Sequence, residues 1–141
     1  MYYINLTMKN NFLKLILYLY YLSLITLLIL YLFPGSIIGY LFYGDPGRQP
    51  NLINNPIGTS INHFFYFTYL TTLALINRLK YKKIINSFNF LFLISTILEL
   101  THYLIPNRTF EFYDLFANSA GVVIVFILFN LLIKIKKKKK I

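Results

Sequence analysis

Cysteine is absent from this chain of 141 residues, and only four residues are acidic. Without cysteine the chain forms no disulfides and has no thiol nucleophiles or thiolate metal sites. Only 13% of the residues are charged and 57% are hydrophobic, whereas roughly a quarter of the residues of a typical soluble domain are charged. The composition therefore predicts an integral membrane protein, with residues 1–141 forming a single domain.

Four long apolar segments follow one another, at about residues 12–33, 61–79, 88–105 and 115–133. Because about 20 helical residues cross a bilayer core, they predict an all-α, integral membrane four-helix bundle. The first segment is too long for a cleaved signal peptide, so we predict that it is retained as a span. Pro106 is expected to end the third span, since the residue before a proline disfavours the helical conformation.

Basic residues indicate the orientation of these spans. Lys9 and Lys14 precede the first span, residues 78–83 hold four basic side chains between the second and third, and a lysine-rich tail, 134–141, follows the fourth. All three groups fall on one side of a four-span protein. The positive-inside rule therefore predicts that both termini are cytoplasmic.

The tail contains an unbroken lysine run, from Lys136 to Lys140. Such a cluster beside a span attracts anionic lipids by about 1 kcal/mol per residue. It is the only basic patch of any size, so we expect no nucleic-acid partner.

Polar residues gather around the junction of the third and fourth spans. Residues three or four apart share a helix face, which groups Glu99 with His102 and, on the fourth span, Asp114 with Asn118 and Gly121. The short loop that carries Arg108 makes the two spans antiparallel neighbours. We therefore expect one polar pocket open to the extracytoplasmic side, with His63, at the start of the second span, facing it.

These residues also fit purely structural roles. Glu99 and His102 are alternatively an interhelical polar clamp, worth about 0.6–2 kcal/mol per hydrogen bond. Arg108 alternatively forms a rim ion pair with Asp114. Glu-x-x-His is also a metal-ligand spacing in helical bundles, but the chain has no second copy of it, so we predict neither a metal nor a cofactor.

The spacing Glu-x-x-(Gln or His), Pro-x-Arg, Asp-x-x-x-Asn-x-x-Gly resembles the signature of the VanZ-like family. These are small multi-span membrane proteins named for a teicoplanin-resistance protein. The resemblance extends over roughly residues 59–125, and His63-Phe64 with Leu70 resembles a second motif of the family. The matching residues of the signature are Glu99, His102, Pro106, Arg108, Asp114, Asn118 and Gly121.

The chain departs from the family pattern at several positions. Thr59 and Ser60 stand where the family usually has Asp-Lys, His102 where glutamine is common, and Val125 where a further glycine is common. The resemblance implies a multi-pass protein of the bacterial cytoplasmic (inner) membrane, acting in the cell envelope. For some members it implies a link to glycopeptide resistance.

Two classes of function fit the predicted pocket. In the first, the pocket binds an anionic lipid head group or a lipid-linked envelope precursor through His63, Arg108, Asp114, Asn118 and Gly121. In the second, the protein is an enzyme that modifies such a molecule, with Glu99 and His102 as catalytic acid and base. The missing Asp-Lys pair favours binding. The sequence does not determine the oligomeric state.

Overall fold

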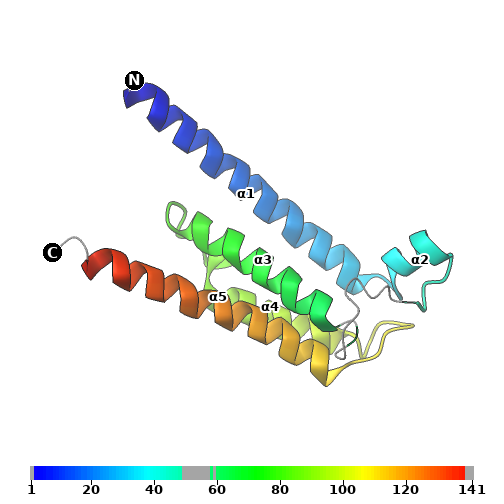
Figure 1. The fold of residues 1–141 in the computed structure, drawn as a ribbon. Helices are drawn as coiled ribbons and strands as arrows, with labels where there is room; N and C mark the ends of the chain where they lie inside the picture. Colours follow the sequence, from blue (N-terminus) through cyan, green and yellow to red (C-terminus); the bar gives the residue numbers. More distant parts are fainter. Residues whose placement is uncertain (1, 49–57, 59, 139–141) are drawn as a thin grey trace.

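In the part of the chain that the computed structural model describes, residues 2–48, 58 and 60–138, all regular structure is helical. Side chains are described from residue 10 onward. The elements are α1 (Tyr2–Leu32), α2 (Ile37–Tyr43), α3 (Ser60–Arg78), the 3₁₀ helix η1 (Ile84–Asn86), α4 (Phe88–Thr101) and α5 (Phe112–Lys138) (Figure 1). The all-α prediction is confirmed.

The third predicted span is shorter than expected. α4 ends at Thr101, not at residue 105, and His102 is its C-cap. The chain then tightens into turns, because the amides of His102, Tyr103 and Leu104 donate to carbonyls only three residues back. Asn107 follows with a φ of 58°. The helix therefore ends before Pro106 constrains it, and the ring of His102 lies at the helix end.

The other long helices match the predicted segments, and two of them, α1 and α5, extend further. α1 begins at Tyr2 and α5 continues to Lys138, through most of the lysine-rich tail. The rest of the tail, 139–141, lies outside the described residues. A proline-glycine turn separates α1 from α2, and Ser36 caps α2 by accepting a hydrogen bond from the amide of Gly39 at 2.9 Å.

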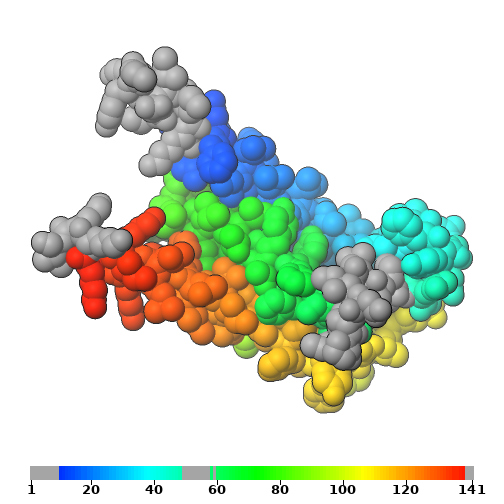
Figure 2. Space-filling model, viewed as in Figure 1, coloured from blue at the N-terminus to red at the C-terminus, as the bar shows by residue number. Residues whose placement is uncertain are grey.

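α3 lies between α1 and α5, and α4 packs against α5 (Figures 1 and 2). The core between these helices contains several fully buried apolar side chains, among them Tyr20, Phe67, Leu70, Leu91 and Val122. α5 approaches α3 closely at Gly121, where an added methyl group would lie 2.7 Å from the carbonyl oxygen of Phe64. The glycine is therefore needed for this helix contact.

Among the described residues, two helical stretches are long and apolar enough to cross a membrane, Asn10–Leu32 and Phe112–Lys138. α4 is apolar but shorter. Both long stretches lie largely on the outside, with only 33% and 28% of their most apolar windows buried. A mostly buried core helix would not expose such a surface to water, so these helices indicate a membrane location.

The start of α1 and the end of α5 lie at the same end of the molecule, and α2 lies at the opposite end (Figure 1). The loop between α3 and α4 belongs to the first of these ends, because Lys80 donates a hydrogen bond to Asn10 at 2.8 Å. Arg108, in the loop between α4 and α5, contacts the end of α1 and so belongs to the second. Basic loops and the polar cluster are therefore at opposite ends.

Candidate functional site

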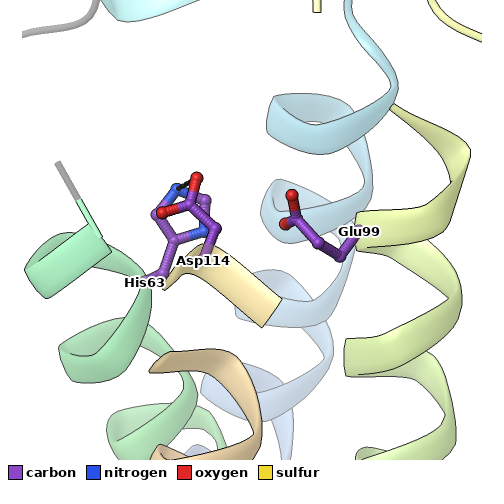
Figure 3. A group of neighbouring side chains, drawn as sticks. All are labelled: His63, Glu99 and Asp114. Atoms are coloured by element: carbon purple, nitrogen blue, oxygen red, sulfur yellow. Dashed lines mark ion pairs between the residues drawn. The ribbon is translucent and has the colours of Figure 1, made fainter. Parts of the chain in front are cut away.

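Four helices contribute to one buried polar cluster at the α2 end of the molecule. Figure 3 shows His63 of α3 beside Asp114 of α5, with Glu99 of α4 pointing toward them. Tyr31, from the last turn of α1, completes the cluster. The structure therefore brings together the polar residues that the sequence assigned to one pocket.

Glu99 is the most enclosed charged residue of the cluster, with 0% of its surface exposed. Its Oε1 accepts from Nδ1 of His102 at 3.2 Å and from the backbone amide of Glu111 at 3.4 Å. Its Oε2 accepts from Nδ2 of Asn118 at 3.4 Å. All three donors therefore point at the carboxylate of Glu99.

These contacts determine the direction of the next hydrogen bonds. Because Nδ2 of Asn118 faces Glu99, its Oδ1 accepts the hydroxyl proton of Tyr31, at 2.9 Å. The hydroxyl oxygen of Tyr31 lies 2.6 Å from Nδ1 of His63. Since that hydroxyl has only one proton, His63 must donate from Nδ1. The Nε2 of His63 is then directed elsewhere.

That nitrogen faces a carboxylate. Nε2 of His63 lies 3.4 Å from Oδ2 of Asp114, the ion pair drawn in Figure 3. Asp114 is 4% exposed, and its Oδ1 has no hydrogen-bond partner among the described residues. The cluster therefore contains two imidazole–carboxylate pairs, the second being His102 with Glu99.

Tyr31 was not identified from the sequence. Its ring stacks on that of His102 with centroids 5.1 Å apart, and its hydroxyl bridges α3 and α5. A tyrosine near the end of an apolar span is typical of an interfacial aromatic belt, and that pattern concealed its role. The sequence does not show which face of α1 packs against His63, so it did not place Tyr31 in the cluster.

Arg108 lies beside the cluster but does not form the rim ion pair with Asp114 that the sequence left open. Its Nη2 donates to the carbonyl of Leu30 at 2.6 Å and its Nε to that of Phe33 at 3.4 Å. These carbonyls at the end of α1 lack helical partners and attract a cation. Burial lowers the pKa of Arg108, but an arginine side chain stays charged at neutral pH.

The remaining residues at positions of the family motifs are described by their burial and by the helix contacts that they make. Leu70 is fully buried in the core, and Gly121 lies at the contact of α5 with α3. Val125, where the family often has glycine, is 9% exposed. Thr59 lies outside the described residues, and Ser60 is 2% exposed at the start of α3.

A cavity of about 170 Å³ opens beside the cluster. Its apolar wall comes from α1, α2 and α3, and includes Leu27, Leu30, Ile37, Ile38 and Phe67. Its polar part includes Tyr31, His63, His102 and Arg108. Glu99 and Asp114 are not part of the wall and lie behind these side chains.

One group of described side chains has the composition and spacing of a metal site. One ligand atom each from His63, Glu99 and Asp114 lies within 4.8 Å of the other two. The arrangement can therefore bind a cation, move protons between imidazole and carboxylate, or hold an anion at Arg108.

The comparisons with known proteins give one family. The family model of VanZ/LLP1 matches residues 12–133. No curated protein and no solved structure matches the chain. The matched region includes α3 and α4, α1 from Phe12 onward, α5 as far as Ile133, and every residue of the polar cluster. The chain belongs to the VanZ/LLP1 family.

Proposed function

We propose that this protein spans the bacterial cytoplasmic membrane four times, with both termini in the cytoplasm. Large apolar side chains are exposed on each of the four long helices, for example Ile25, Phe65, Leu93 and Leu128. A soluble monomer rarely exposes this much apolar surface, whereas lipid covers it without cost. The lysine-rich end then faces the cytoplasm, and the polar cluster faces the cell envelope.

In that membrane, we propose that the cavity binds an anionic lipid head group or a lipid-linked envelope precursor. The observation that carries this proposal is the combination of an apolar wall from α1, α2 and α3 with a polar part that includes His63, His102 and Arg108. An acyl or prenyl chain suits the apolar wall, and a phosphate suits the polar part. The cavity volume, about 170 Å³, accommodates a head group rather than a whole lipid.

Arg108 is the residue suited to the phosphate. Two of its nitrogens are held by the carbonyls of Leu30 and Phe33 at the end of α1, so the planar guanidinium is fixed in place before a ligand arrives. An arginine in this position presents its remaining N–H groups to an anion with little further loss of side-chain entropy. Asp114 and Glu99 have their own imidazole partners and leave Arg108 available.

The second candidate is an enzyme that modifies the same molecule. The observation that favours it is the presence of two imidazole–carboxylate pairs next to a cavity that both histidines line. A histidine oriented by a carboxylate is a common general base. In this case His63 or His102 would transfer a proton, and Glu99 and Asp114 would orient the rings.

The test is to purify the protein in mild detergent and identify copurified lipids by mass spectrometry. Binding is then measured in nanodiscs with phosphatidylglycerol and undecaprenyl phosphate, and with phosphatidylcholine as the lipid without net charge. We expect a bound anionic lipid that is displaced by the first two probes. Conversion of a probe to a new product would favour the enzyme. Equal binding of all three lipids would contradict both candidates.

A further inference from the structure

We propose that His63, Glu99 and Asp114 form a binding site for one divalent transition-metal ion, with Zn²⁺ or Mn²⁺ as the best chemical match. The three side chains come from α3, α4 and α5 and converge on one point (Figure 3). Their ligand atoms lie within 4.8 Å of one another. Around an ion with bonds of roughly 2.0–2.4 Å, ligand atoms lie about 3–4.8 Å apart.

The direction of the hydrogen bonds supports this assignment. His63 donates from Nδ1 to Tyr31, as derived above, so Nε2 is the atom that faces Oδ2 of Asp114, at 3.4 Å. If the imidazole is neutral, two lone pairs face each other across that distance. A metal ion between them removes this repulsion, and a histidine that binds a metal through Nε2 usually donates its other ring nitrogen in this way.

A second observation is the unpartnered oxygen of Asp114. Its Oδ1 is buried without a hydrogen-bond partner among the described residues, on a side chain that is 6% exposed. An unpaired buried carboxylate oxygen is costly. Arg108 does not donate to this oxygen, because its hydrogen bonds go to the carbonyls of Leu30 and Phe33 at the end of α1. A dication would supply a partner for this oxygen and balance the two buried carboxylates.

The donor set selects the kind of metal. One imidazole nitrogen with two carboxylate oxygens is intermediate between the nitrogen-rich sites of Cu²⁺ or Ni²⁺ and the all-oxygen sites of Mg²⁺ or Ca²⁺. Three protein ligands also leave a coordination position for another group, as in catalytic zinc sites. Because His63 lines the cavity, that position is reached from the cavity. This assignment goes beyond lipid binding and does not require it.

The test uses the full chain in detergent, with a purification tag that contains no histidine. The protein is stripped with a chelator, dialysed and titrated calorimetrically with ZnCl₂ and separately with MnCl₂. We expect one ion per chain for at least one of these metals. Co²⁺ should also bind and give a visible absorption spectrum typical of nitrogen and oxygen ligands.

Variants identify the ligands. Asp114→Asn and Glu99→Gln keep the size of the side chain and should each weaken binding at least tenfold. Glu111→Gln is the matched control, because its exposed side chain is not a ligand, and it should bind like the parent. Should a ligand variant fail to fold, Tyr31→Phe provides a second measurement, since losing the partner of a ligand histidine should weaken binding about 10–100-fold.

Less than a tenth of an ion per folded parent chain would overturn the proposal, as would unchanged binding by Asp114→Asn. In either case, His63 and Asp114 form an imidazolium–carboxylate ion pair without a metal. Lipid retention measured on the chelator-treated protein separates this result from the proposed function, because loss of the metal site leaves the apolar wall and Arg108 intact.

Discussion

The hydroxyl of Tyr31 lies 2.6 Å from Nδ1 of His63 and ties the end of α1 to the start of α3. The same hydroxyl donates to Asn118 on α5 at 2.9 Å, and the ring stacks on His102 after α4. One side chain of α1 therefore contacts the other three long helices or their ends. It also gives His63 a defined orientation toward Asp114.

The first prediction is that Tyr31→Phe reduces lipid retention by more than its loss of thermal stability explains. Removing the hydroxyl leaves Nδ1 of His63 and Oδ1 of Asn118 without their shared partner. Leaving buried polar groups unpaired costs about 1–3 kcal/mol, so thermal unfolding in detergent should occur at a lower temperature. Lipid retention should fall as well, because the His63 ring is no longer oriented.

Tyr20→Phe is the matched control for this prediction. The Tyr20 hydroxyl donates to the carbonyl of Ile85, near the opposite end of the molecule, and Tyr20 is fully buried. This variant also loses one interhelical hydrogen bond of α1. Its melting temperature should fall comparably, while lipid retention stays at the parent level. Equal loss of retention in both variants would show that Tyr31 acts only through stability.

The sequence predicted those contacts that depend on the spacing of residues along one helix. Glu99 and His102 pair because they are three residues apart on one helix, and Asp114 and Asn118 share a face for the same reason. Apolar length alone located the four long helices, α1, α3, α4 and α5, but not α2 or η1. The convergence of Glu99 with Asn118, at 3.4 Å, followed from the short loop between their helices.

The unpredicted part depends on contacts distant in sequence. Arg108 binds carbonyls of α1 more than 70 residues away, and the sequence gives no sign that those carbonyls are nearby. The role of Tyr31 depends on how α1 packs against α3, which periodicity does not determine. α4 ends early because the backbone forms turns between Glu99 and Leu104. The prediction based on the position of Pro106 therefore placed the end of this helix four residues too late.

The second prediction concerns orientation in the membrane. Because the chain has no cysteine, single introduced cysteines can be labelled without background. Asp45→Cys, in the loop after α2, should react with a membrane-impermeant maleimide in intact cells. Lys82→Cys, in the loop between α3 and α4, should react only after the cells are opened. Both positions are exposed, so accessibility is not limited by packing. The reverse pattern would invert the proposed topology.

The third prediction tests the close approach of α5 to α3. Gly121→Ala would place a methyl group 2.7 Å from the carbonyl oxygen of Phe64, a backbone atom that cannot rotate away. We expect destabilisation of about 1–3 kcal/mol, as for other overpacked interfaces, seen as a lower melting temperature. Gly47→Ala is the control, since the nearest atom there is the flexible carboxylate of Asp45. An unchanged melting temperature for Gly121→Ala would mean that the helices separate easily.

The fourth prediction separates the charge of Arg108 from its geometry. Arg108→Lys keeps the positive charge but replaces a planar group by a single nitrogen. One ammonium cannot contact the carbonyls of Leu30 and Phe33 and also present fixed donors to a phosphate. We therefore expect at least a tenfold weaker affinity for undecaprenyl phosphate or phosphatidylglycerol, about 1.4 kcal/mol, with insertion into the membrane unchanged.

Arg48→Lys is the control for that comparison, because the Arg48 guanidinium carbon, in the loop after α2, lies 4.1 Å from the ring centroid of Tyr43 and Arg48 is not part of the cavity wall. It also replaces one guanidinium by an ammonium on the same side of the protein without changing the charge, so it controls for the loss of a guanidinium outside the cavity wall. Its affinity should match that of the parent. If Arg108→Lys also binds like the parent, charge alone is enough and the carbonyls of α1 do not position a phosphate-binding group. If both variants weaken equally, a guanidinium outside the cavity wall contributes as much as Arg108, and the cavity is not the binding site.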